Sequence, residues 1–182
     1  MDDYFNGIVY ATGHIVSDEG KQYLVVRNTD PWYIDYISSK TQYKKYKSGY
    51  HEKNRNRDQW VVKVRNISKI VDLSDIQSIS DFCRAYIEIH GVLDLAKYGK
   101  DKRKLRLRIF GKEQIIQYMN KNLPAKEKKI QYIKNMVADK YVGRTCAIYY
   151  QSQKEVEDIL KFIDGYPKNN KIWERWESLL SR

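Results

Sequence analysis

The chain has 182 residues, of which 42% are hydrophobic and 31% charged, a balance that excludes a disordered protein and favours a folded one. No apolar run approaches the roughly 20 residues that span a bilayer, and Met1-Asp2-Asp3 lacks the basic region of a secretory signal, so we expect a cytoplasmic protein without a membrane partner. The net charge of +11 indicates a polyanionic partner, and Cys83 and Cys146 lack the CxxC spacing of a zinc site.

The first half of the chain predicts two long helices, three strands and a short closing helix. Residues 3–19 are expected to form one helix that ends near Gly20, because apolar side chains recur every three or four positions. Thr29-Asp30-Pro31 supplies a capping side chain and a first-turn proline for a helix over 31–40. Strands are predicted at 23–26, 43–50 and 59–65, with a polar tip between the last two, and a short helix at 68–73.

The same order begins again at Ser80. Helices are expected over 80–91, 112–122, 153–163 and 171–180, and strands at 92–98, 105–110, 130–137 and 144–150. Trp173 and Trp176 lie at helical spacing, which favours core packing over a partner-binding stripe. Because no Gly/Ser-rich linker separates the two rounds, the sequence predicts an α+β protein with an internal repeat, residues 1–78 and 79–182, around one shared core.

The two helices that open the repeats carry related segments, ATGHIVSDEG at 11–20 and FCRAYIEIHG at 82–91. Both have small residues within the helix and a polar ending before glycine. Small residues let two helices approach closely, and an acid at each helix end can place carboxylates side by side. In this double pattern the chain resembles the LAGLIDADG homing endonucleases, and the repeat order extends the resemblance over nearly its whole length.

The resemblance implies two pseudo-symmetric αββαββα repeats in a single-chain monomer. In that family paired central helices lie under two saddle-shaped antiparallel sheets that grip DNA, and acids at the helix ends hold divalent metal. Carried onto this chain, the metal-binding and catalytic acids become Asp18 and Glu19 in the first repeat. In the second repeat the equivalent place is His90, with Glu88 the nearest acid. One acid is therefore missing, and we expect double-strand cleavage to be lost or reduced, with magnesium needed only for residual nuclease activity and no cofactor needed for binding.

Two basic runs are candidates for binding nucleic acid or a protein partner. The first covers residues 43–57, with six basic residues, one acid and three tyrosines, and its alternative role is a solvated hairpin edge. In the second, at 100–108, Leu105 and Leu107 are predicted to face the core, with Arg106 and Arg108 on the opposite sheet face. The candidate binding residues are Tyr43, Lys44, Lys45, Tyr46, Lys47, Tyr50, Lys53, Arg55, Arg57, Lys102, Arg103, Lys104, Arg106 and Arg108.

Three functions follow from the resemblance. Compact Lys- and Tyr-rich proteins are typical of phage and other mobile elements, and the chain is similar to anti-CRISPR inhibitors of Cas9. The first hypothesis is therefore binding to the Cas9–guide RNA complex in the host cytoplasm, which blocks target DNA cleavage, with guide RNA cleavage or remodelling as an extension. The alternatives are a divergent homing endonuclease that cuts DNA with magnesium, and a catalytically dead regulator or intron maturase that binds DNA or RNA.

Overall fold

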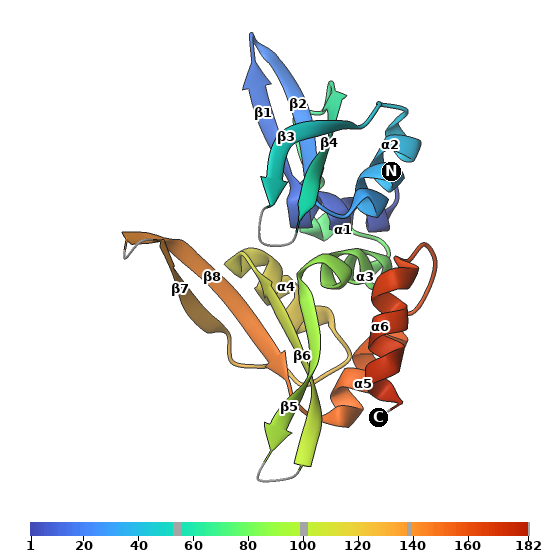
Figure 1. Cartoon of the computed structure of the whole chain (residues 1–182), viewed down its shortest axis with the longest axis vertical. Coiled ribbons are helices and arrows are strands. Elements are labelled where there is room, and N and C mark those ends of the chain that lie inside the picture. The colour runs from blue at the N-terminus through green and yellow to red at the C-terminus, as the bar shows by residue number, and fades with distance from the viewer. Residues whose placement is uncertain (53–55, 99–101, 138–139, 182) are drawn as a thin grey trace. The chain divides into compact units, whose positions relative to one another are not determined.

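The chain forms two four-stranded antiparallel sheets, one in each of two units, Met1–Ser78 and Ile79–Arg182 (Figure 1). The structure is a computed structural model that describes residues 1–52, 56–98, 102–137 and 140–181. None of the helices in these ranges has the length and apolar character needed to cross a membrane.

The first unit is built from two helices, four strands and a short 3-10 turn. Its elements are α1 (Asp3–Thr12), β1 (Gly13–Asp18), β2 (Lys21–Asn28), α2 (Pro31–Thr41), β3 (Tyr46–Glu52), β4 (Arg57–Arg65) and the 3-10 turn Leu73–Asp75. The strand order in the sheet is β1-β2-β4-β3. One sheet face carries Leu24, Val26, Val62 and Val64, all buried. These side chains form the core together with the apolar residues of α1 and α2.

The second unit repeats this order and adds two helices. Its elements are α3 (Ile79–His90), β5 (Gly91–Tyr98), β6 (Lys102–Gly111), α4 (Glu113–Asn122), β7 (Gln131–Val137), β8 (Lys140–Tyr150), α5 (Gln153–Ile163) and α6 (Asn170–Leu180). The strand order β5-β6-β8-β7 matches that of the first sheet position by position. The prediction of an α+β fold with two LAGLIDADG-like repeats is thus confirmed, although over its described residues the first unit lacks the final helix of the expected αββαββα repeat.

Most predicted elements are present, and for α2 and α6 the side chains that the sequence singled out have the expected positions. The α2 helix begins where Asp30 and Pro31 predict, and Oδ1 of Asp30 accepts a hydrogen bond from the backbone N–H of Trp32 at 3.1 Å. Trp173 and Trp176 are 6% and 4% exposed, so α6 uses them for packing. Two predictions are wrong. The helix at 3–19 ends at Thr12 and gives way to β1, and the short helix at 68–73 is replaced by the 3-10 turn at Leu73–Asp75.

A glycine marks the change from helix to strand in each repeat. Gly13 follows α1 and Gly91 follows α3. A Cβ atom on Gly13 would lie 2.7 Å from the carbonyl oxygen of Val9, and one on Gly91 would collide with the carbonyl oxygen and side chain of Ile87. The chain can therefore turn out of the helix within one residue only because these positions have no side chain.

Substitution of Gly91 by alanine is expected to lower the free energy of unfolding by about 2 kcal/mol, because the added methyl group must displace the last turn of α3. Urea unfolding followed by circular dichroism measures the change. Val92→Ala is the control, since Val92 is 36% exposed and its truncation should cost less than about 0.5 kcal/mol. Equal stability of the two variants would contradict the close approach at Gly91.

Candidate functional site

The repeat-starting helices end without a carboxylate. The last residue of α1 is Thr12, whose hydroxyl donates a hydrogen bond to the carbonyl oxygen of Ile8 at 3.2 Å. The last residue of α3 is His90, whose ring centroid lies 5.1 Å from that of Tyr86. In both repeats glycine follows at once, so Thr12 and His90 occupy the helix-end position for which the resemblance implies an acid.

Asp18 and Glu19 do not lie at a helix end, which corrects the prediction made for the first repeat. Asp18 is the last residue of β1 and pairs with Lys21, and Glu19 and Gly20 make the turn to β2 with positive φ angles of 48° and 75°. Both acids are exposed. The periodicity of apolar residues continues through Ile15 and Val16, which is why spacing alone assigned β1 to the helix.

Glu88 has a structural position within the second unit. Its side chain is buried, at 4% exposure, and Oε1 accepts hydrogen bonds from the indole N–H of Trp173 at 2.7 Å and from the backbone N–H of Asn169 at 3.3 Å. The carboxylate therefore ties α3 to the start of α6. Both hydrogen bonds go to Oε1, so this oxygen of the buried carboxylate serves the packing of the second unit.

The described residues do not fit the paired metal site of the resemblance. Magnesium prefers carboxylate oxygens, whereas the two helix ends offer a hydroxyl and an imidazole. In the ranges that the structure describes, no three histidine, cysteine, aspartate or glutamate side chains are grouped so that they could hold a metal ion.

The face of the first sheet opposite Leu24 and Val62 combines cations with two buried valines, Val25 and Val61. Antiparallel partners share a face, and the register pairs Val25 with Lys63, Tyr23 with Arg65 and Arg27 with Val61. Arg27, Lys63 and Arg65 are all exposed. None of these three cations was among the predicted binding residues, although the alternation Val62-Lys63-Val64-Arg65 signals Lys63 and Arg65. They form what we call the first polar face.

The basic run at 43–57 is divided between the two faces of this sheet. Tyr46 pairs with Val61 and shares the first polar face, whereas Lys47 pairs with Trp60 on the helix side. Lys45 forms an ion pair with Asp35 of α2, and its ammonium lies 5.0 Å from the Trp60 ring centroid. The helix side thus takes two of the lysines assigned to binding.

The other residues of this run have varied positions. Lys47 forms an ion pair with Asp58 at 2.5 Å. The backbone carbonyl of Tyr43 accepts a hydrogen bond from the hydroxyl of Ser38. Lys44, Tyr50 and Arg57 are exposed. Lys53 and Arg55 lie outside the described residues.

The second sheet shows the predicted alternation along β6. Leu105 and Leu107 are buried, and the side chains of Arg106 and Arg108 are each 28% exposed on the opposite face, as expected. Lys104 shares this face, which we call the second polar face. Arg103 lies two residues before Leu105 and so shares its face of the sheet. It lines a cleft with Leu179 and Leu180 of α6, on the helix side. The side chain of Lys102 lies outside the described residues.

Asp94, which the sequence analysis did not single out, lies between the two arginines. The register pairs it with Arg106, whose Nε donates to Oδ1 at 2.9 Å and whose Nη2 donates to Oδ2 at 3.0 Å. Nη2 of Arg108 donates to Oδ2 at 2.6 Å. The hydrogen bonds from Arg106 hold the pKa of Asp94 below its ordinary value, against the raising effect of partial burial. Asp94 therefore stays ionised at neutral pH.

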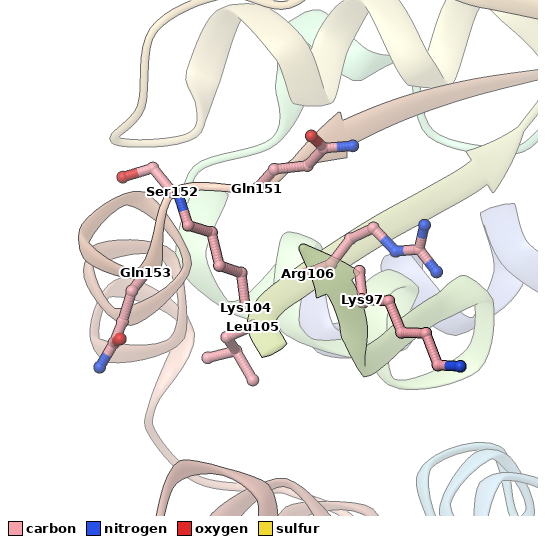
Figure 2. Close-up of a pocket in the computed structure, with 8 residues that line it drawn as sticks. Lys97, Lys104, Leu105, Arg106, Gln151, Ser152 and Gln153 are labelled. Atoms are coloured by element: carbon pink, nitrogen blue, oxygen red, sulfur yellow. The ribbon is translucent and has the colours of Figure 1, made fainter. Parts of the chain in front are cut away.

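A cleft of about 510 Å³ borders the second polar face (Figure 2). It forms because β8 ends at Tyr150 opposite Leu107, so that the start of β6 extends beyond its neighbour and the chain turns away into α5. Figure 2 shows Lys104 reaching toward Ser152, while Arg106 and Lys97 run the other way. The cations of the cleft do not converge, so the cleft forms only the margin of the second polar face.

Positive charge is unequally shared between the two units. Residues 1–78 contain 12 lysines and arginines against 10 acids, and residues 79–182 contain 22 against 13. Most of the net charge therefore belongs to the unit that carries the second polar face.

The topology and the two repeated sheets define the LAGLIDADG fold. The chain superposes on I-LtrWI, a LAGLIDADG homing endonuclease bound to target DNA, with a TM-score of 0.63 and 14% identity over 98% of this chain and 89% of that one. For the meganuclease I-AabMI bound to uncleaved DNA the TM-score is 0.63 at 9% identity, over 100% and 92% of the two chains. For I-GzeII in complex with its DNA target it is 0.63 at 9% identity, over 98% and 89%. No protein-family model and no functionally curated protein matches the sequence.

Proposed function

We propose that this protein is a divergent LAGLIDADG-type DNA-binding protein that grips duplex DNA with its two polar faces. The observation that carries the proposal is the recurrence of cations on the face of each sheet opposite the helices. Arg27, Lys63 and Arg65 are exposed in one sheet, and Arg106 and Arg108 are partly exposed in the other. Structural neighbours with the same fold were crystallised with DNA.

A sheet face of this kind suits duplex DNA for two physical reasons. Arginine and lysine neutralise backbone phosphates and release counterions, which supplies affinity without regard to sequence. The guanidinium fork also matches the major-groove edge of guanine, which supplies selectivity. Because both units belong to one chain, a monomer in the host cytoplasm would contact two half-sites without a second copy.

We expect the protein to bind its DNA site without cutting both strands. Thr12 and His90 occupy the helix ends at which a LAGLIDADG nuclease would need acids to hold magnesium, and neither side chain is a strong ligand for that ion. DNA binding then persists after the chemistry is lost, since the polar faces and the helix ends are separate parts of the sequence. The autonomous endonuclease is the alternative outcome.

The test is selection of duplexes from a fully randomised library, followed by gel shift and by incubation of the selected duplex with Mg²⁺ or Mn²⁺. We expect selective binding whose affinity falls steeply with salt. The slope of log affinity against log salt concentration should be about −0.9 for each phosphate that the protein neutralises. Incubation with the metal ions should give no double-strand cleavage product. Double-strand cleavage would favour the endonuclease, and failure to select any duplex would contradict the proposal.

Inhibition of the Cas9–guide RNA complex, with or without guide RNA cleavage, stays a prediction of the resemblance. The same basic surfaces that suit DNA also suit an exposed guide RNA. Its test is target cleavage by Cas9 and guide RNA with and without this protein, with DNA and RNA analysed on denaturing gels. Full Cas9 activity at excess protein would remove this function and leave DNA binding unaffected.

A further inference from the structure

Asp94 is placed to hold two arginines at once on the second polar face. Arg106 meets the carboxylate side-on, through Nε and Nη2, and Arg108 adds a third hydrogen bond through Nη2. The side chains of all three residues are only 28–30% exposed. The guanidinium of Arg108 also lies 5.8 Å from the centroid of the Phe110 ring. Both cations are therefore restrained before any ligand arrives.

The side-on geometry leaves one edge of Arg106 available. Nε and one Nη2 proton point to Asp94, so the end-on edge, Nη1 with the second Nη2 proton, receives no acceptor among the residues that the structure describes. This edge carries parallel N–H groups, the arrangement that pairs with O6 and N7 of guanine in the major groove.

An acid is an unfavourable choice for a surface that only attracts phosphates. A carboxylate on the second polar face cancels one of the positive charges that would drive counterion release. Its cost is offset if it fixes the orientation of the arginines, because base reading depends on geometry while phosphate attraction depends mainly on charge.

We infer that Asp94 is a positioning residue that sets sequence specificity, by holding Arg106, with Arg108 bound to the same carboxylate, in the orientation that reads guanine in the half-site of the second unit. This inference rests on the proposed DNA binding. It assigns specificity to an acid that itself touches no base.

The inference predicts opposite changes in two affinities. Asp94→Asn removes a negative charge, so binding to a non-selected duplex should tighten, while binding to the selected duplex should weaken. We expect the ratio of the two affinities to fall about tenfold, since a well-formed arginine pair with guanine discriminates by roughly that factor. The matched control is Asp158→Asn, which removes the same charge from an exposed ion pair with Lys154 on α5 and should leave the ratio unchanged.

A second readout separates base reading from a purely structural pairing of β5 with β6. Guanines of the selected duplex are replaced one at a time by 7-deazaguanine, which lacks the N7 acceptor. At one position the unaltered protein should lose about tenfold in affinity, whereas the Asp94→Asn variant should lose less than twofold. A structural role alone gives the same loss for both proteins.

Arg106→Lys keeps the charge, removes the fork and provides a second variant should Asp94→Asn fold poorly by circular dichroism. We expect it to reproduce the loss of the affinity ratio, and the double variant to be no worse than either single one. An unchanged ratio in both single variants would overturn the inference while leaving DNA binding intact. Failure of the unaltered protein to select any duplex would overturn both.

Discussion

Replacement of Arg106 and Arg108 together by alanine is expected to weaken binding of the selected duplex by on the order of a hundredfold, since each arginine contact with a base or phosphate is worth about 1–3 kcal/mol. Fluorescence anisotropy with labelled duplex at several salt concentrations measures the effect. Each lost phosphate contact lowers the magnitude of the slope of log affinity against log salt by about 0.9. The magnitude should therefore fall by about two if both arginines contact phosphate, and by less if at least one of them contacts a base.

The control for this experiment removes two charges elsewhere in the same unit. Lys171 and Arg175 are exposed residues of α6, which lies on the helix side of the second sheet, opposite the second polar face. Their double replacement by alanine should change affinity by less than about threefold, because exposed charges beyond the Debye length of about 10 Å are largely screened. A loss equal to that of the Arg106 and Arg108 variant would mean that total charge, and not the second polar face, determines binding.

Glu88→Ala is expected to lower the free energy of unfolding by about 3 kcal/mol, the largest effect that we predict on stability. The change leaves the buried indole N–H of Trp173 and the backbone N–H of Asn169 without their shared acceptor. Glu88→Gln retains an acceptor oxygen and should lose about 1 kcal/mol. Urea unfolding followed by tryptophan fluorescence measures both, with m values checked for equality.

This comparison also tests the role that the resemblance gave to Glu88. If Glu88 were a catalytic acid, its change to glutamine would abolish activity, and its change to alanine would leave the free energy of unfolding nearly unchanged. If Glu88 is a structural hydrogen-bond acceptor, its change to alanine lowers the free energy of unfolding and its change to glutamine is tolerated. A stable Glu88→Ala variant would therefore contradict the structural role.

The sequence predicted features that depend on near neighbours. The start of α2 was predictable from Asp30 and Pro31, because a cap and a first-turn proline act within three residues. The burial of Leu105 and Leu107 with Arg106 and Arg108 opposite was predictable from the two-residue period of a strand.

The end of α1 was not predictable from spacing. Ile15 and Val16 continue the helical periodicity of Phe5, Ile8 and Val9, although they belong to a strand. The physical signal was Gly13, where a side chain would strike the carbonyl oxygen of Val9. In the second repeat the helix was predicted to end at Gly91, and α3 ends at His90 immediately before it.

Asp94 was not predictable because its role depends on register. The pairing of β5 with β6 brings it opposite Arg106, twelve residues away, and one residue of slip would place it on the helix side. The division of the 43–57 run has the same origin, since pairing with β4 decides that Tyr46 and Lys47 face opposite ways. Composition identifies such runs as basic but cannot tell which of their charges share a surface.

The unequal charge of the two units has a consequence for how the protein meets a long polyanion. Residues 79–182 have nine more basic than acidic residues, and residues 1–78 have only two more. The two units should therefore be attracted to the polyanion with unequal strength. The second unit should make the first, diffusion-driven contact and carry most of the salt dependence of the association rate. The first unit, with little long-range attraction, should add its contacts later and lengthen the lifetime of the complex.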